Sequence, residues 1–402
     1  MRSGRSFLLI AFAFLVIMAG GGLPAPLYVV YQKAWGFSPG ILTVVFAAYA
    51  VGLLFALVAF RNASDRLGRK KVLLVGVLVA LASTGVFLLA QNVGWLIVAR
   101  LLSGASTGLC ASTATAALTE TEPSGDRRRA TRWITVITAL GVGVGPFYAG
   151  FLIQYGPDPL TLSFWVLFAL LLAALVAVVL AHDGPHGQST GPPSSGGLFQ
   201  VPSAIRPVFF LSATAAFVGF TLAGLFSGLA PSFLTDDLGI TNHALAGATV
   251  LLMFGSAALA QLWWQARRSA LVLQIGATIA PVALALIAIA VVTGVPAPFF
   301  LGTVLCGAGF GLCLLGGLGM LNQVAPPDRR GAVLSGFYVA AYLGLSAPIV
   351  SIGVLADSIG LPTAVVLLAV AISLLSVVGI LTRRALRNAS QRVGGGEPAP
   401  PV

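Results

Sequence analysis

The chain consists of long, nearly continuous apolar runs that alternate with short clusters of charged, Pro and Gly residues. A helix needs about 20 mostly apolar residues to cross a bilayer. These runs are far longer than the roughly 10-residue alternating strands of a membrane β-barrel. The pattern predicts an all-α integral membrane protein whose twelve spans lie near residues 7–31, 41–60, 72–91, 93–118, 131–154, 160–181, 206–234, 244–265, 269–293, 297–323, 331–355 and 361–382.

A polar segment containing GPHGQSTGPPSSGG follows the sixth span, and its Gly, Pro and Ser content is typical of a flexible linker. We therefore predict an N-terminal six-helix bundle at 1–181, a cytoplasmic linker at 182–205, a C-terminal six-helix bundle at 206–382 and a cytoplasmic tail at 383–402. Two pseudo-symmetric halves of this kind occur in many secondary transporters, which bind substrate between the halves near the midplane.

The composition supports a membrane protein, because 58% of the residues are hydrophobic and only 8% are charged, against about 25% charged in soluble domains. The net charge is +11, and every Lys and Arg except Lys33 and Arg100 falls on one side of the predicted topology. This positive-inside pattern predicts a multi-pass protein of the plasma membrane with both termini in the cytoplasm. The basic charge therefore reflects contact with the lipid bilayer, and no motif predicts a nucleic-acid partner.

The chain has few residues suited to metal binding or catalysis. Cys306 and Cys313 are two helical turns apart, and we expect them to be small packing residues. His182 and His186 are spaced i, i+4, but they lie in the predicted linker. The sequence also has no G-x-x-x-x-G-K-[ST] loop for binding ATP. We expect no metal, no cofactor, no catalytic residue and no enzyme activity, so that transport depends on a gradient or on facilitated diffusion.

The stretch RNASDRLGRKK at residues 61–71 lies between the second and third predicted spans. It resembles the loop signature G-x-x-x-D-R-x-G-R-[KR] of the major facilitator superfamily through Asp65, Arg66, Gly68, Arg69 and Lys70. The resemblance implies a gating loop that holds the cytoplasmic side closed in the outward-facing state. In such a loop Asp65 accepts hydrogen bonds at a helix N-terminus, and Gly68 permits a tight turn.

The cations of this loop can face lipid phosphate or the carboxylates of Glu120 and Glu122. A solvated positive-inside loop would explain the cations but not Asp65 and Gly68 at these spacings. The sequence departs from the signature at Arg61, which occupies the first Gly position of the family and puts a close helix approach there in doubt.

A second resemblance lies in the fourth span, where Arg100 and Gly104 are similar to the family pattern R-x-x-x-G. In the family, this Arg is linked to proton transfer. An Arg at mid-membrane costs about 2.5–3.5 kcal/mol on insertion scales, so it should face the interior and have a partner or a function. The alternative is an anchor at the end of the span, with its side chain extended to the interface.

A third resemblance lies in the fifth span, in GVGVGPFYAG at residues 141–150. This stretch resembles the family pattern G-x-x-x-G-P-x-x-G through Gly141, Gly145, Pro146 and Gly150. Within the family, that pattern is associated with antiporters that export drugs. The glycines allow backbones to approach closely, and a proline kinks a helix. Simple helix packing is the alternative explanation.

By this resemblance, spans 1, 4, 7 and 10 line the substrate cavity, and the candidate lining residues are Tyr28, Tyr31, Gln32, Ser103, Thr107, Phe220 and Phe226. Such a lining suits an amphipathic or lipophilic compound better than a sugar, whose hydroxyl groups all need partners. We therefore expect a secondary active exporter of small organic, drug-like compounds, with the proton as coupling ion. The alternatives are an importer or facilitator of a small metabolite or sugar, and a receptor or scaffold that transports nothing.

Coupling to protons requires a group that titrates, and all eleven acidic residues fall in loops, tails or span ends. Arg100 cannot take this role, because a guanidinium stays protonated in proteins. The candidates are therefore acids at the membrane boundary, on the outer side Asp357, Asp236 or Asp237 and on the inner side Glu120 or Asp65.

Overall fold

The structure is a computed structural model that describes residues 2–60, 63–182, 201–228, 233–234, 238–326 and 329–394. These residues contain helices and no strand. The helices are α1 (Arg2–Gly22), α2 (Leu27–Trp35), α3 (Pro39–Ala59), α4 (Ala63–Leu67), α5 (Arg69–Leu88), α6 (Val93–Thr121), α7 (Arg127–Tyr155), α8 (Leu162–Leu180), α9 (Arg206–Gly228), α11 (His243–Trp264), α12 (Ser269–Thr293), α13 (Pro296–Val324), α14 (Arg330–Ile359) and α15 (Leu361–Gly394).

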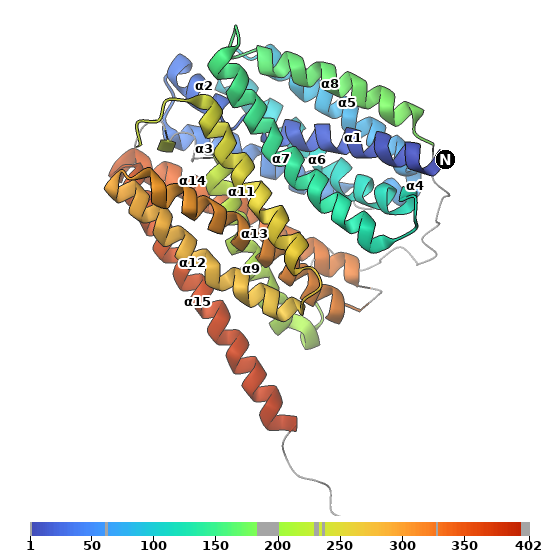
Figure 1. Cartoon of the computed structure of the whole chain (residues 1–402), viewed down its shortest axis with the longest axis vertical. Coiled ribbons are helices and arrows are strands. Elements are labelled where there is room, and N and C mark those ends of the chain that lie inside the picture. The colour runs from blue at the N-terminus through green and yellow to red at the C-terminus, as the bar shows by residue number, and fades with distance from the viewer. Residues whose placement is uncertain are drawn as a thin grey trace, which may run out of the picture.

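Twelve segments of the described chain are long and apolar enough to cross a membrane. The prediction of an all-α protein with twelve spans is therefore confirmed. The last helix runs on through Gly394, well past the end predicted for its span, and Figure 1 shows α15 extending beyond the other helices. Its extra turns carry Arg, Ala and Leu, which are strong helix formers.

Several helices begin where a polar side chain caps them, as residues of these types commonly do. Asn92 accepts a hydrogen bond from Gly94 N (3.0 Å), and Asp126 accepts one from Arg128 N (2.8 Å). These caps lie next to the polar clusters that the sequence shows between apolar runs, which explains why the span boundaries were predictable.

The sequence analysis predicted one helix for the first span, but the structure has two, α1 and α2. Pro24 and Pro26 have no N–H to donate, and the N–H of Ala25 bonds to Gly22 O (3.1 Å) in a tight turn. The carbonyl oxygen of Gly21 consequently accepts no main-chain hydrogen bond in the described chain. A break in mid-span thus leaves an acceptor free for a side chain from another helix.

The helices pack as an N-terminal bundle, α1 to α8, and a C-terminal bundle, α9 to α15. Between the bundles, α7 packs on α11 and α3 packs on α14. We call the end that carries the N-terminus, α4 and the start of α7 the basic end, and the other the opposite end. Figure 1 shows the bundles meeting at the opposite end, near α2, and splayed toward the basic end.

Candidate functional site

Arg100 lies inside the N-terminal bundle, with only 2% of its surface exposed. Its Nη1 donates a hydrogen bond to Gly21 O (2.8 Å), the carbonyl freed by the break between α1 and α2. The guanidinium carbon also lies 4.4 Å from the ring centroid of Tyr49, 5.8 Å from that of Phe46 and 5.9 Å from that of Tyr28. The side chain is therefore an interior charge and not an anchor at the membrane interface.

This position is held by the close approach of α3 to α6. A Cβ added to Gly104 would overlap Tyr49 O and lie 2.8 Å from Leu53 N, so only glycine fits there without a backbone shift. The two backbones are near contact one helical turn from Arg100, which brings the Tyr49 ring against the guanidinium. Gly104 and Arg100, which belong to the same sequence pattern, thus build one feature of the structure.

Neutral groups stabilise the Arg100 charge. A hydrogen bond to a charged group contributes about 1.5–3 kcal/mol, and a buried cation–π contact about 0.5–2 kcal/mol. Together these are comparable with the insertion cost of about 2.5–3.5 kcal/mol. The carbonyl and the rings therefore allow a guanidinium to sit in the bundle without an acidic partner.

Polar side chains predicted to line the cavity gather around this charge. Thr107, on the turn after Ser103, donates to Ser103 O (3.0 Å) and lies with Tyr49 close to Gly21. Tyr28 is buried, and its hydroxyl has no hydrogen-bond partner among the described residues. The break between α1 and α2, the second span and the fourth span thus meet at one polar centre.

The remaining predicted cavity residues lie elsewhere. Tyr31 and Gln32 lie on α2 toward the opposite end, where the Tyr31 and Trp35 rings are 4.8 Å apart. Phe226 is fully buried and packs against Phe299, with ring centroids 5.9 Å apart. The structure does not bring these three residues to Arg100.

Phe220 lies in an aromatic cluster of the C-terminal bundle. Its ring centroid is 5.2 Å from those of both Phe310 and Tyr342. Tyr342 lies on α14, which packs on α3, the helix of the N-terminal bundle that carries Tyr49. Sequence reasoning missed Tyr49 and Tyr342, because it assigned the cavity to spans 1, 4, 7 and 10, whereas these residues lie on α3 and α14.

The glycine and proline motif of α7 packs against two helices. On one face, a Cβ at Gly141 or Gly145 would overlap atoms of α1, namely Met18 Cβ and Ala19 O. On the other face, a Cβ at Gly150 would overlap His243 O of α11. The motif therefore lies where the N-terminal bundle meets the C-terminal bundle. We call this contact the α7–α11 seam, formed by Gly143, Pro146 and Gly150 on α7 and by His243, Gly247 and Leu251 on α11.

The predicted gating loop lies at the basic end. Arg69 donates to Ser64 Oγ (2.7 Å) and forms an ion pair with Glu120 (3.3 Å). Lys70 donates to the carbonyls of Val179 (2.7 Å) and Ala181 (2.8 Å) at the end of α8. These two cations tie helices within the N-terminal bundle.

The other loop residues take different positions. Gly68 has φ 92°, in the region that favours glycine, and Arg66 is exposed. Asp65 lies in α4, but its side chain, like residues 61 and 62, is outside what the structure describes. The second acid that the sequence offered to this loop, Glu122, pairs instead with Arg129 (3.5 Å).

Glu122 organises the turn between α6 and α7. It accepts hydrogen bonds from the hydroxyl (2.6 Å) and the N–H (2.7 Å) of Ser124 and from the N–H of Asp126 (3.1 Å). The Ser124 hydroxyl bond is the main reason that the pKa of Glu122 lies below its ordinary value, although desolvation opposes the shift. This carboxylate is therefore held ionised.

Asp357 joins the two bundles at the opposite end. Near the end of α14, it accepts hydrogen bonds from Ser38 Oγ (3.1 Å) and Gly40 N (3.4 Å) at the start of α3. At the basic end, Arg132 Nε lies 3.5 Å from Gln265 Oε1 across the α7–α11 seam. Any movement that separates α3 from α14 at the opposite end has to break the Asp357 contacts.

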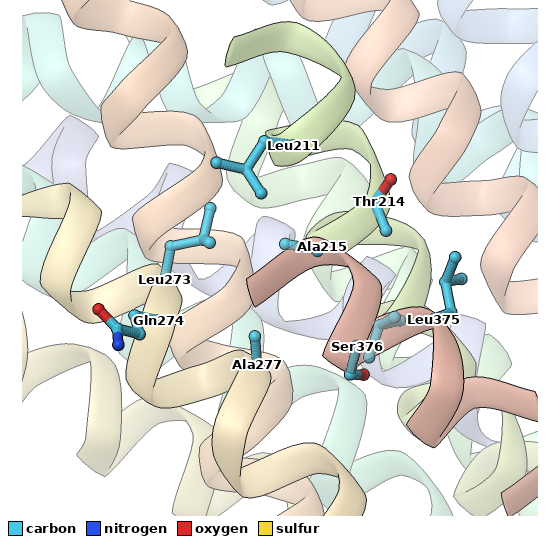
Figure 2. Close-up of a pocket in the computed structure, with 10 residues that line it drawn as sticks. Leu211, Thr214, Ala215, Leu273, Gln274, Ala277, Leu375 and Ser376 are labelled. Carbon is cyan, nitrogen blue, oxygen red and sulfur yellow. The ribbon is translucent and has the colours of Figure 1, made fainter. Parts of the chain in front are cut away.

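A pocket in the C-terminal bundle lies between α9, α12 and α15 (Figure 2). Its lining is mostly apolar, with Leu211, Leu273 and Leu375 among the labelled side chains. Because none of its lining residues belongs to the N-terminal bundle, it lies apart from the centre around Arg100. The described residues contain no group of three or more His, Cys, Asp or Glu suited to a metal.

Comparison with known proteins gives consistent matches. Residues 10–290 match the Major Facilitator Superfamily. The Quinolone resistance protein NorA of Staphylococcus aureus (strain MRSA252) is 25% identical over 188 residues, which cover 46% of this chain and 48% of the relative. Multidrug resistance protein 2 of Bacillus subtilis (strain 168) is 25% identical over 265 residues, or 62% of this chain and 66% of the relative. The chain thus matches about half the length of the NorA relative.

A solved structure shares the fold. It is the crystal structure of a bacterial homolog to the human lysosomal transporter Spinster, in an inward-facing and unoccupied conformation. It covers 95% of this chain and 97% of its own, with a TM-score of 0.77 at 15% identity. The family match extends over more than half of the chain, and the proteins it resembles are transporters and not enzymes. The chain belongs to the Major Facilitator Superfamily of membrane transporters.

Proposed function

We propose that this transporter exports small amphipathic or lipophilic organic compounds by alternating access coupled to proton antiport. The observation that carries the proposal is the position of the α7 motif, with one face on α1 and the other on α11 of the second bundle. A helix packed so closely against both bundles has to repack when they move relative to each other. The names of the two relatives, which refer to quinolone and multidrug resistance, support export of drug-like molecules.

The contacts between the two bundles support alternating access, because opening the opposite end requires them to break or rearrange. In this structure the bundles are tied by Asp357 at the opposite end and along the α7–α11 seam. Opening the opposite end requires the Asp357 contacts to break and the seam to rearrange. Closing the basic end would then bring the gating loop toward the C-terminal bundle.

The proposed orientation places the basic end in the cytoplasm of a cell bounded by the plasma membrane. It rests on the asymmetry of Lys and Arg along the chain. Both termini would then be cytoplasmic. Protease digestion of a tag on the C-terminus tests this orientation, because the tag should be cut in everted vesicles and protected in intact cells.

Proton coupling is proposed to act through a boundary acid. Among the described acids, Asp357 is the one whose carboxylate joins the two bundles, so its protonation would weaken its hold on α3. Asp236 and Asp237, also candidates, lie outside the described residues. Arg100 serves in this scheme as a fixed charge that orients water and substrate.

A flux assay in everted vesicles tests the proposal. An exporter coupled to protons should load amphipathic compounds into vesicles with an acidic interior, and a protonophore should stop the loading. Emptying of the vesicles under the same gradient would indicate an importer. Equilibration without regard to the gradient would indicate a facilitator, and no flux of any compound would indicate a receptor or scaffold.

A further inference from the structure

Arg100 carries a positive charge that no acid among the described residues balances within a membrane span. The acids nearest to spans lie at their ends, such as Glu120 at the end of α6 and Asp357 at the end of α14. In the described chain, the Arg100 side chain has one hydrogen bond, to the neutral carbonyl of Gly21. A desolvated cation of this kind attracts a negative charge strongly, because the surrounding medium screens it poorly.

Two buried hydrogen-bond donors beside this charge also lack acceptors. Arg100 Nε and Tyr28 Oη are each fully enclosed and without a partner among the described residues. The Tyr28 ring faces the guanidinium at 5.9 Å. A buried donor without an acceptor costs about 1–3 kcal/mol, so a native site that keeps two of them needs an explanation. A carboxylate supplies two acceptor oxygens and the missing negative charge together.

The same centre borders the contact between the two bundles. Tyr49, whose ring covers the guanidinium, lies on α3, which packs on α14 of the C-terminal bundle. The Phe46 ring lies against Gly228 of α9, where an added Cβ would be 3.5 Å from it. Within the C-terminal bundle, the ring centroid of Tyr342, on α14, lies 5.2 Å from that of Phe220. A molecule bound at Arg100 would meet aromatic faces from both bundles.

We propose that the substrate is an amphipathic aromatic anion, whose carboxylate binds Arg100 and Tyr28 and whose ring system packs among the aromatic side chains at the bundle contact. This inference rests on the proposed export function and specifies its substrate class. It also has a consequence for energetics. Export of an anion from a cell with a negative interior is driven by the membrane potential, by about 2.3 kcal/mol per charge for each 100 mV.

Binding to the purified full-length protein in nanodiscs of zwitterionic lipid tests the substrate class without depending on flux. The probes share one ring system: naphthoate, its neutral methyl ester, and naphthylmethyl-trimethylammonium. Calorimetry should give a Kd for naphthoate that is about tenfold or more below that of the ester, the factor that one charge-assisted hydrogen bond supplies. The cation should bind more weakly than the ester.

Variants then assign the preference to the site. The preference is measured as the Kd of the ester divided by the Kd of naphthoate. Arg100→Gln should bring this ratio close to one, and Arg100→Lys should keep part of the preference because the charge remains. Tyr28→Phe should lower the ratio several-fold while keeping the ring. The matched control is Ser212→Ala in the C-terminal bundle. It removes a hydroxyl that is buried and has no hydrogen-bond partner among the described residues, and it should leave the ratio unchanged.

The outcomes separate this inference from the proposed function. Equal binding of acid and ester, or tighter binding of the cation, by the wild-type protein would overturn the inference even if the Arg100 variants fail to fold. Displacement of naphthoate by added anionic phospholipid would also overturn it, because the site would then bind a lipid headgroup. Selective naphthoate binding by a protein that shows no gradient-driven flux would support the anion site and refute the proposed exporter.

Discussion

A methyl group placed in the α7–α11 seam should shift the conformational equilibrium of the transporter. Gly247 of α11 lies against α7, and a Cβ added there would overlap Pro146 O and lie 2.9 Å from Phe147 Cα. Both neighbours are backbone atoms, which cannot move aside as the end of a side chain can. Gly247→Ala therefore has to push the two helices apart in this conformation.

The size of the effect follows from the cost of overpacking. Inserting one methyl group into a tightly packed contact costs about 1–3 kcal/mol, which corresponds to a shift of about five- to 150-fold in an equilibrium constant. The cost falls on the conformation in which the seam is closed, as it is here. We expect the population to move toward the state that is open at the opposite end and closed at the basic end.

Distances between spin labels at the basic end measure this shift. Leu67 of α4 is exposed, and a Cβ added to Gly331 at the start of α14 would meet nothing within 4 Å, so both accept an introduced cysteine and a label. The three native cysteines are buried and should not react. In Gly247→Ala, the distribution of distances between the labels should shift to shorter values, and the transport rate should fall.

The matched control is Gly255→Ala in the same helix, where an added Cβ meets nothing within 4 Å. It should leave the distance distribution unchanged and stabilise α11 through helix propensity, by about 0.8–1 kcal/mol. Wild-type distances in both variants, at normal expression, would refute the idea that the seam distinguishes the two conformations.

Four further predictions concern charged residues. Arg100→Ala should abolish flux driven by a pH gradient in everted vesicles, and Arg100→Lys should restore it only in part; wild-type flux in Arg100→Ala would contradict a role in transport. Asp357→Asn should raise the reactivity of a cysteine introduced at the opposite end and alter the pH dependence of flux, and unchanged values of both would remove Asp357 from the coupling scheme. Lys70→Met should lower the midpoint of thermal unfolding by removing two hydrogen bonds to the end of α8, whereas exposed Lys71→Met should not. Because the pKa of Glu122 is lowered in the folded protein, its stabilisation of the α6–α7 turn is present at neutral pH and lost as the pH falls through that lowered pKa. Hydrogen exchange of the turn amides should report this loss in the wild type, and Glu122→Gln should show no such pH dependence.

The sequence alone determined the number and the helical type of the spans, although α15 continues through Gly394, past the end predicted for its span. A bilayer offers no hydrogen-bond partner to the backbone, so each apolar run of about 20 residues has to be helical. Polar clusters mark the ends because charged groups stay out of the hydrocarbon region. The break in the first span was not predicted, although it coincides with GGGLPAP at residues 20–26, where two prolines remove main-chain donors.

The partners of the charged residues were decided by tertiary structure. Arg100 bonds to Gly21, 79 residues earlier in the chain, and Asp357 bonds to Ser38 across 319 residues. The motif at residues 61–71 predicted an acidic partner at the end of the fourth span, but only packing selected Glu120 for Arg69 and left Glu122 to Arg129.

The physical reason lies in the surroundings of a membrane helix. Lipid tails are as apolar as Leu side chains, so a span shows apolar residues on every side and its pattern does not identify the face that packs on a neighbour. The placement of Tyr28 and Tyr49 around Arg100 depends on how closely α1, α3 and α6 approach one another. The sequence shows glycines such as Gly104 that permit a close approach of two helices. Only the assembled bundle determines which backbone each glycine contacts.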